Sequence, residues 1–151
     1  MLDAAADCPS ALRPATQPSW IKMMITSIYA AIAGLFLIFL SLRVIRLRRS
    51  RKVSIGSAEV PELERAMRVQ SNFIEYTPIT LLLLFLLEHV GAPDWTVHLF
   101  GLGFAVSRLL HFLGMRSPEA PGMMRVAGIL GTFAVIAALS LALLMRFFGF
   151  V

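Results

Sequence analysis

The sequence has little of what many enzymes use for chemistry. Its single cysteine, Cys8, cannot form an internal disulfide and has no neighbours at metal-ligand spacing. We find no glycine-rich phosphate loop, no cluster of histidine and cysteine with metal spacing, and no Ser-His-Asp arrangement. Any reactive thiol must therefore come from a ligand.

Charge is also scarce, at 15% of 151 residues, whereas 58% are hydrophobic. This composition excludes an ordinary soluble domain and is typical of an integral membrane protein with about four spans of roughly 20 residues. The expected fold class is all-α, an up-down four-helix transmembrane bundle. We place its spans at about residues 23–47, 61–90, 94–115 and 122–148.

Residues 1–22 differ in composition, with Pro9, Pro14 and Pro18 among small and acidic residues. They lack the basic start and apolar core of a signal peptide. We predict a disordered tail here, and the methionines at 23 and 24 are an alternative translation start.

Lysine and arginine are concentrated around the two segments that connect spans one to two and three to four. The residues on that side are Arg43, Arg46, Arg48, Arg49, Arg51, Lys52, Arg65, Arg68, Arg108, Arg116 and Arg125. The positive-inside rule then predicts cytoplasmic connecting segments and both termini outside, in a bacterial inner membrane. The basic cluster after the first span has no interleaved aromatics, so we expect anionic lipid headgroups and not nucleic acid as its partner.

The second span begins polar and ends apolar. Residues 64–78 carry charges at helical intervals and continue without a break into the apolar residues 79–87. An ionisable side chain at bilayer depth costs at least about 2.5 kcal/mol, so such residues pair, face a wet cavity or serve a site. Arg68, Asn72 and Glu75 fall on one helix face with Tyr76, whereas Gln70 points roughly the other way.

We interpret this face as a binding site, and two plainer readings remain open. One is an ion-pair stripe that holds helices together; the other is a juxtamembrane start that stays in water. In an up-down hairpin, the C-terminal half of the third span lies beside the N-terminal half of the second. Arg108 and His111 are therefore expected at the level of Arg68 and Asn72.

The polar segment closely resembles the hallmark of the MAPEG family, the membrane-associated proteins of eicosanoid and glutathione metabolism, and more specifically its uncharacterised bacterial branch. The hallmark has the form E-R-x-x-R-x-x-x-N-x-x-E-x-x-P. The matching residues here are Glu64, Arg65, Arg68, Asn72, Glu75 and Pro78. The resemblance extends over about residues 26–146 and implies a homotrimer with sites between subunits.

What the resemblance implies for function is a site for glutathione as co-substrate, with no metal. Arginine can hold a carboxylate through two parallel hydrogen bonds, which suits Arg48 and Arg68, and Glu75 would hold the ammonium group. Asn72 and Gln70 offer amides for the peptide backbone. The full set placed at glutathione is Arg48, Arg68, Gln70, Asn72, Glu75, Tyr76, Arg108 and His111.

The catalytic residues implied are Arg125, with Arg49 as an accessory. Arg125 is similar to the arginine that activates the glutathione thiol in family enzymes, after a shift of about one residue in the preceding loop. A cation near sulfur lowers the thiol pKa and favours the reactive thiolate. The chain departs from the best-known members at Met115 and His111, where tyrosines are expected, so these two ligand contacts differ.

The leading hypothesis is a glutathione-dependent transferase or peroxidase acting on a lipophilic electrophile or hydroperoxide that enters from the lipid between subunits. The alternative is a non-catalytic membrane protein that binds lipid or a small anion in the same pocket. A transporter is disfavoured, since its polar residues would lie near the midplane.

Two structural expectations complete the reading of the sequence. We predict that Pro78 bends the second span and frees the carbonyl of Ile74, which Thr77 or a water would satisfy. Small residues let membrane helices approach closely, so an oligomer would use the surfaces that carry them. The glycines concerned are Gly101, Gly103, Gly128 and Gly131.

Overall fold

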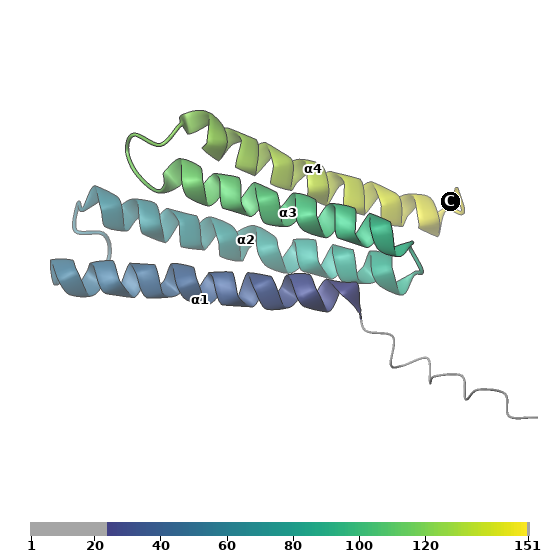
Figure 1. Ribbon diagram of the computed structural model, residues 1–151, viewed down its shortest axis with the longest axis horizontal. Helices are drawn as coiled ribbons and strands as arrows, with labels where there is room; N and C mark the ends of the chain where they lie inside the picture. The colour runs from purple at the N-terminus through teal and green to yellow at the C-terminus, as the bar shows by residue number, and fades with distance from the viewer. Residues whose placement is uncertain (1–23, 151) are drawn as a thin grey trace, which may run out of the picture.

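The computed structural model describes residues 24–150, and this part of the chain forms four long helices without strands (Figure 1). Each helix is long and apolar enough to cross a membrane. The helices are α1 (Ile25–Arg51), α2 (Pro61–His89), α3 (Asp94–Met115) and α4 (Gly122–Phe147). The all-α fold class is confirmed. The tail predicted for residues 1–22, with Cys8, lies outside the described residues.

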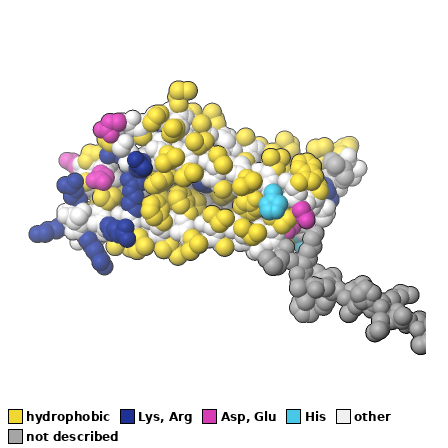
Figure 2. Space-filling view, viewed as in Figure 1, with side chains coloured by type: hydrophobic (Ala, Val, Ile, Leu, Met, Phe, Trp, Pro, Cys, Tyr) yellow, Lys and Arg dark blue, Asp and Glu magenta, His cyan; other side chains and the backbone are white. Residues whose placement is uncertain are grey.

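The helices run alternately up and down, so the loops after α1 and α3 lie at the same end (Figure 1). Lysine and arginine gather at that loop end, while hydrophobic side chains cover the middle (Figure 2). Helices α2 and α3 pack against each other and against both outer helices, whereas the described parts of α1 and α4 share no contact. The bundle is therefore open on the side between α1 and α4.

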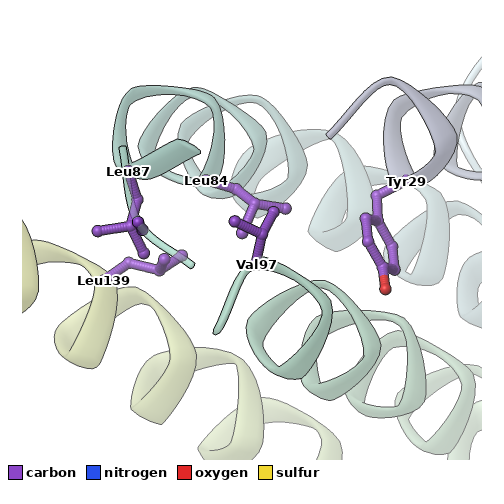
Figure 3. Close-up of a cluster of buried hydrophobic side chains, with 6 residues drawn as sticks. Tyr29, Leu84, Leu87, Val97 and Leu139 are labelled. Atoms are coloured by element: carbon purple, nitrogen blue, oxygen red, sulfur yellow. The ribbon is translucent and has the colours of Figure 1, made fainter. Parts of the chain in front are cut away.

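The core at the end of the bundle where α2 connects to α3, opposite the loops after α1 and α3, is a cluster of aliphatic side chains from three helices. Figure 3 shows Leu84 and Leu87 of α2 beside Val97 of α3 and Leu139 of α4, with Tyr29 of α1 nearby. All five are at least 93% buried. Burying a large aliphatic side chain stabilises a soluble fold by about 1.5–3 kcal/mol, but in lipid the gain comes mainly from close packing.

Helix α2 continues through Pro78. Thr77 Oγ1 donates to the carbonyl of Phe73 at 2.6 Å, and Thr80 Oγ1 donates to that of Tyr76 at 2.7 Å. Our prediction that Thr77 satisfies the Ile74 carbonyl is therefore wrong. A threonine hydroxyl in a helix reaches the carbonyl one turn earlier, and for Thr77 that carbonyl belongs to Phe73.

The expectation that the glycines let helices approach closely is confirmed within the chain, and their use in an oligomer stays a prediction. A Cβ on Gly101 would strike the Tyr29 ring, and one on Gly131 would strike the Ser107 hydroxyl. On Gly128 it would lie 2.5 Å from the His111 nitrogen, and on Gly103 it would lie 3.4 Å from Val135. These residues set the close approach of α3 to α1 and α4.

A carboxylate from α2 caps the first turn of α1. Glu88 accepts hydrogen bonds from the backbone nitrogens of Ile25, at 2.5 Å, and Thr26, at 2.8 Å. A negative charge at a helix N-terminus satisfies free N–H groups and complements the helix dipole. Glu88 therefore fixes the position of α1 against α2 at the end away from the loops.

We expect Glu88→Ala to lower the free energy of unfolding by about 1 kcal/mol, the usual cost of removing a cap. In a chain of this size that corresponds to roughly 2–4 °C in Tm. Thermal unfolding in one detergent measures the effect, and Glu88→Gln, which keeps an acceptor oxygen, is expected to lose less. An unchanged Tm in Glu88→Ala would contradict the capping role.

Candidate functional site

The polar face of α2 is exposed in the single chain. Leu63, Val69 and Phe73 are buried on the side toward the bundle, whereas Glu64, Arg68 and Glu75 are exposed on the opposite side. Arg68 and Glu64 form an ion pair at 3.1 Å, one turn apart, with 71% and 50% of their side chains exposed. Such an exposed pair adds little stability.

The depth of this face follows from the contact between α1 and α2. Gln70 Nε2 donates to Ser41 Oγ at 2.8 Å, near the end of the uncharged run of α1 that stops before Arg43. Glu75 lies five residues further along α2, about 7.5 Å deeper at 1.5 Å per residue. No polar partner for Glu75 is seen among residues 24–150. An exposed, unpaired carboxylate at this level is costly against lipid, so the face requires another chain, a ligand or water.

Arg108 is the centre of a buried polar cluster. It is 4% exposed, and its guanidinium donates to Asn72 Oδ1 at 2.7 Å, to the Gly128 carbonyl at 3.1 Å and to Thr132 Oγ1. The predicted convergence of Arg108 with Asn72 is thus present. These bonds join α2, α3 and α4 and fix the amide of Asn72 with its oxygen toward Arg108.

Two aromatic rings complete the surroundings of Arg108. Its guanidinium carbon lies 5.8 Å from the ring centroids of both Tyr76 and Phe104. Tyr76 also makes an edge contact with Phe133 of α4, at 5.4 Å between centroids. Tyr76 is therefore held between the buried cluster and the exposed face.

His111 lies one turn after Arg108 and is 5% exposed. Its Nδ1 is buried without a hydrogen-bond partner among the described residues. The backbone of His111 packs against Gly128. His111 therefore lies at the contact between α3 and α4, inside the chain.

Arg125 lies at the start of α4, next to the end of α3. Its side chain is exposed, and Nη1 is 3.9 Å from the sulfur of Met115. Gly114 allows this approach, because a Cβ there would strike the backbone nitrogen of Arg125. Thioether sulfur is a weak acceptor, so this contact leaves the guanidinium available to a stronger partner.

The two arginines predicted near the end of α1 differ from each other. Arg48 donates to the carbonyls of Ser54 and Gly56, at 3.3 and 3.0 Å, and approaches the Met67 sulfur at 3.4 Å. It therefore holds the loop between α1 and α2. Arg49 is exposed.

The single chain brings Asn72, Tyr76 and Arg108 together, with His111 one turn away. Within the part of the chain that the structure describes, no hydrogen bond or ion pair joins Asn72, Tyr76 or Arg108 to Arg48, Arg49 or Arg125, whereas the His111 side chain lies within hydrogen-bond reach of the Arg125 backbone. The predicted site residues thus form one buried cluster and separate exposed positions at the loop end.

Sequence reasoning missed the partners of the buried residues. Gly128 and Thr132 complete the Arg108 cluster, and Ser41 is the partner of Gln70. A usable pattern was present, since Gly128 and Thr132 are spaced i, i+4 in an otherwise apolar span and hence share a face.

Among the described residues, no group of three or more histidine, cysteine or acidic side chains is placed to hold a metal ion.

Comparison with known proteins agrees with the sequence motif. The chain is 36% identical to the inner membrane protein YecN of Escherichia coli strain K12 over 91 residues, which are 60% of this chain and 70% of that relative. The protein of the same name from Escherichia coli O6:H1 matches equally. Together with four membrane-capable helices, this similarity supports an integral inner membrane protein. The model of the MAPEG family matches residues 26–145, and the chain therefore belongs to the MAPEG family.

Proposed function

We propose that the protein is a glutathione-dependent membrane enzyme, a transferase or peroxidase that presents the glutathione thiolate to a lipophilic electrophile or hydroperoxide. The observation that carries this proposal is the exposed polar face of α2. Arg68 and Glu75 are exposed on this face, and among residues 24–150 neither has a partner inside the bundle, in a chain of the MAPEG family. A charged, zwitterionic tripeptide is a suitable occupant, because it offers groups of both signs.

The roles proposed for this face follow from its donors and acceptors. Arg68 holds a ligand carboxylate in exchange for its exposed pair with Glu64, and Glu75 holds the ammonium group. Because Asn72 Oδ1 accepts from Arg108, its Nδ2 is left to donate to a peptide carbonyl. Tyr76 offers its hydroxyl next to Asn72.

Two residues that we predicted as direct contacts are better assigned to positioning. Arg108 and His111 are buried, and Arg108 orients Asn72. Gln70 donates one N–H to Ser41 and keeps its second N–H and its side-chain oxygen for a ligand. Arg48 is occupied by loop carbonyls, so it can meet a carboxylate only through donors not used there.

Arg125 is proposed to stabilise the thiolate, with Arg49 as an accessory. Both are exposed at the loop end, where the N-terminus of α4 adds positive potential. The thiol proton leaves to water. In a transfer, the sulfur forms a bond to carbon while a leaving group departs with its electron pair, or while a double bond takes the pair and then a proton from water. In a peroxide reduction, the sulfur attacks the terminal oxygen, the O–O bond breaks and the alkoxide takes a proton to give the alcohol; a second glutathione then converts the sulfenic acid to the disulfide and water. A homotrimer is part of this proposal, since a neighbouring subunit can cover the face of α2 and supply Arg48 and Arg49. The connecting loops are placed in the cytoplasm.

The second candidate is a non-catalytic membrane protein that binds lipid or a small anion. The internal partners of Arg48, Arg68 and Arg108 favour it, because all three have structural contacts in the single chain. Binding and activation of glutathione distinguish the two candidates.

The test is a titration of the protein in lipid nanodiscs with reduced glutathione near neutral pH, followed by the ultraviolet absorbance of the thiolate. We expect a saturable signal. Glu75→Gln is expected to weaken binding by about ten- to a hundredfold, since a charge-assisted hydrogen bond contributes roughly 1.5–3 kcal/mol. Glu59→Gln, which removes a loop carboxylate of the same charge, is the matched control. Absence of binding at millimolar glutathione in folded protein excludes the proposed enzyme.

A further inference from the structure

Arg65 is the arginine of the family hallmark that the proposed glutathione site does not use. It is partly buried, whereas Arg68, one turn further along α2, is exposed. Among residues 24–150 it has no hydrogen-bond partner and no ion pair, and its Nε is buried without an acceptor. A guanidinium carries five N–H donors, and a buried donor of a charged group that stays unpaired costs free energy. Arg65 therefore has donors available for an anion.

Arg43 and Arg116 bring two more positive charges to the same place. Arg43 of α1 donates from Nη2 to the carbonyl of Arg116, at the end of α3, at 3.2 Å, and its Nη1 is buried without a described acceptor. The charges of Arg65 and Arg116 both act on that of Arg43. Arg43 and Arg65 lie two and five residues closer to the loops than the contact between Ser41 and Gln70. At 1.5 Å per residue their levels differ by about 4.5 Å, which two arginine side chains can span.

The carboxylates of this region do not balance the three arginines. Glu62 is the acidic residue whose charge acts on Arg43, and it lies 3.8 Å from Arg51. Within the described chain, no ion pair joins Arg43, Arg65 or Arg116 to a carboxylate. Because like charges repel, the loop ends of α1, α2 and α3 meet at an electrostatic cost that a bound anion relieves.

The surroundings of Arg43 indicate an anion of the lipid headgroup layer. Arg43 is the first charge after the uncharged run of α1, and its guanidinium carbon lies 5.5 Å from the centroid of the Phe112 ring. Phe112 contacts Phe39, at 5.7 Å between ring centroids, and Phe39 is 47% exposed. Aromatic rings next to a cation at the end of an apolar span are typical of the boundary between acyl chains and headgroups. A phospholipid fits this boundary, with its phosphate at the level of Arg43 and its chains beside Phe39.

We propose that Arg43, Arg65 and Arg116 bind the phosphate group of an anionic phospholipid from the leaflet on the loop side. A guanidinium can donate two parallel hydrogen bonds to phosphate oxygens, so one phosphate can be shared by arginines of α1, α2 and the end of α3. The lipid then holds the loop ends of these three helices together. The site uses none of the residues assigned to glutathione and does not rest on that function.

The test compares dioctanoyl phosphatidylglycerol, dioctanoyl phosphatidylcholine and inorganic phosphate as ligands of the protein in a non-ionic detergent. Native mass spectrometry counts bound molecules, and thermal unfolding measures stabilisation. We expect one phosphatidylglycerol per chain, a higher Tm, and at least about tenfold weaker binding of phosphatidylcholine, which has no net charge. Equal binding of the two lipids overturns the proposal. Inorganic phosphate that binds as tightly as phosphatidylglycerol also overturns it, because the ligand is then the free anion and not a lipid.

Two variants test the location. Arg65→Gln breaks no described hydrogen bond or ion pair, and Arg43→Gln keeps a donor for the Arg116 carbonyl. Each is expected to weaken phosphatidylglycerol binding at least about tenfold, the effect of losing a charge-assisted hydrogen bond. Lys52→Gln, which removes an exposed charge from the same end of the bundle, is the matched control and is expected to bind like the parent.

Three results overturn the assignment of the site. The first is parent-like binding in folded Arg65→Gln. The second is an equal loss in Lys52→Gln, which would show diffuse attraction to the basic end of the bundle. The third is displacement of the lipid by millimolar glutathione, because the anion at these arginines would then be glutathione.

Discussion

Replacement of Arg125 by alanine is expected to reduce glutathione-dependent turnover by about 100- to 1,000-fold, the usual effect of removing one preorganised stabiliser of a developing charge. The side chain is exposed at the N-terminus of α4, and its one described side-chain contact is weak, 3.9 Å from the Met115 sulfur. It can therefore turn toward a sulfur anion. The thiolate absorbance at saturating glutathione is expected to fall in parallel.

Stability separates a role in chemistry from a role in folding. Arg125 forms no ion pair within the described residues, so its alanine variant is expected to keep the Tm and oligomeric state of the parent. Arg125→Lys keeps a charge but loses the planar fork, and intermediate activity is expected. Arg116→Ala, which removes a positive charge from the neighbouring loop, is the matched control. Full thiolate absorbance in Arg125→Ala would rule out the assigned role.

Position 115 carries methionine where the better-known family members carry tyrosine, and in this structure Met115 contacts Arg125. A tyrosine at position 115 would place a hydroxyl beside Arg125, the arginine that we propose to activate the thiol. Methionine offers only a weak sulfur acceptor and a flexible apolar chain. The ligand pose near Arg125 therefore depends more on the arginine alone, which is why its substitution is expected to have a large effect.

The fold was predictable because membrane helices are specified by length and hydropathy. The uncharged run at residues 23–42 continues into α1 from Ile25 onward, and the run at residues 126–145 lies in α4. The charge distribution also predicted that both loops share one end. The approach of Arg108 to Asn72 was predictable as well, because antiparallel neighbours place the end of one span beside the start of the next. Local rules were sufficient for these features.

Side-chain partners were not predictable to the same degree. The spacing of residues predicts which side chains share one face of a helix. It does not predict which neighbouring helix packs against that face. Arg108 was expected at a ligand and is instead bonded to Asn72, Gly128 and Thr132. The spacing of Gly101 and Gly128 predicted close helix contacts but not which helices they join, since small residues serve contacts within and between chains alike.

We expect Gly128→Ala to cause a large loss of stability. The new Cβ would lie 2.5 Å from the His111 nitrogen and 2.6 Å from the Ser107 carbonyl oxygen. Both are backbone atoms of α3 and cannot rotate away, so α3 and α4 must separate. That movement also weakens the bond from Arg108 to the Gly128 carbonyl.

The expected cost is at least about 1–3 kcal/mol, the range for overpacked cores, or roughly 2–12 °C in Tm for a chain of this size. Gly34→Ala is the matched control, because a Cβ at Gly34 of α1 meets nothing within 4 Å. It is expected to be neutral or to raise the Tm, since alanine favours helix by about 1 kcal/mol over glycine. Equal Tm values for the two variants would show that α3 and α4 are not in the close contact described here. A lower Tm in Gly128→Ala but not in Gly34→Ala would show that the absence of a side chain at residue 128 allows the close contact of α3 and α4. That contact positions Arg108 and, through it, Asn72.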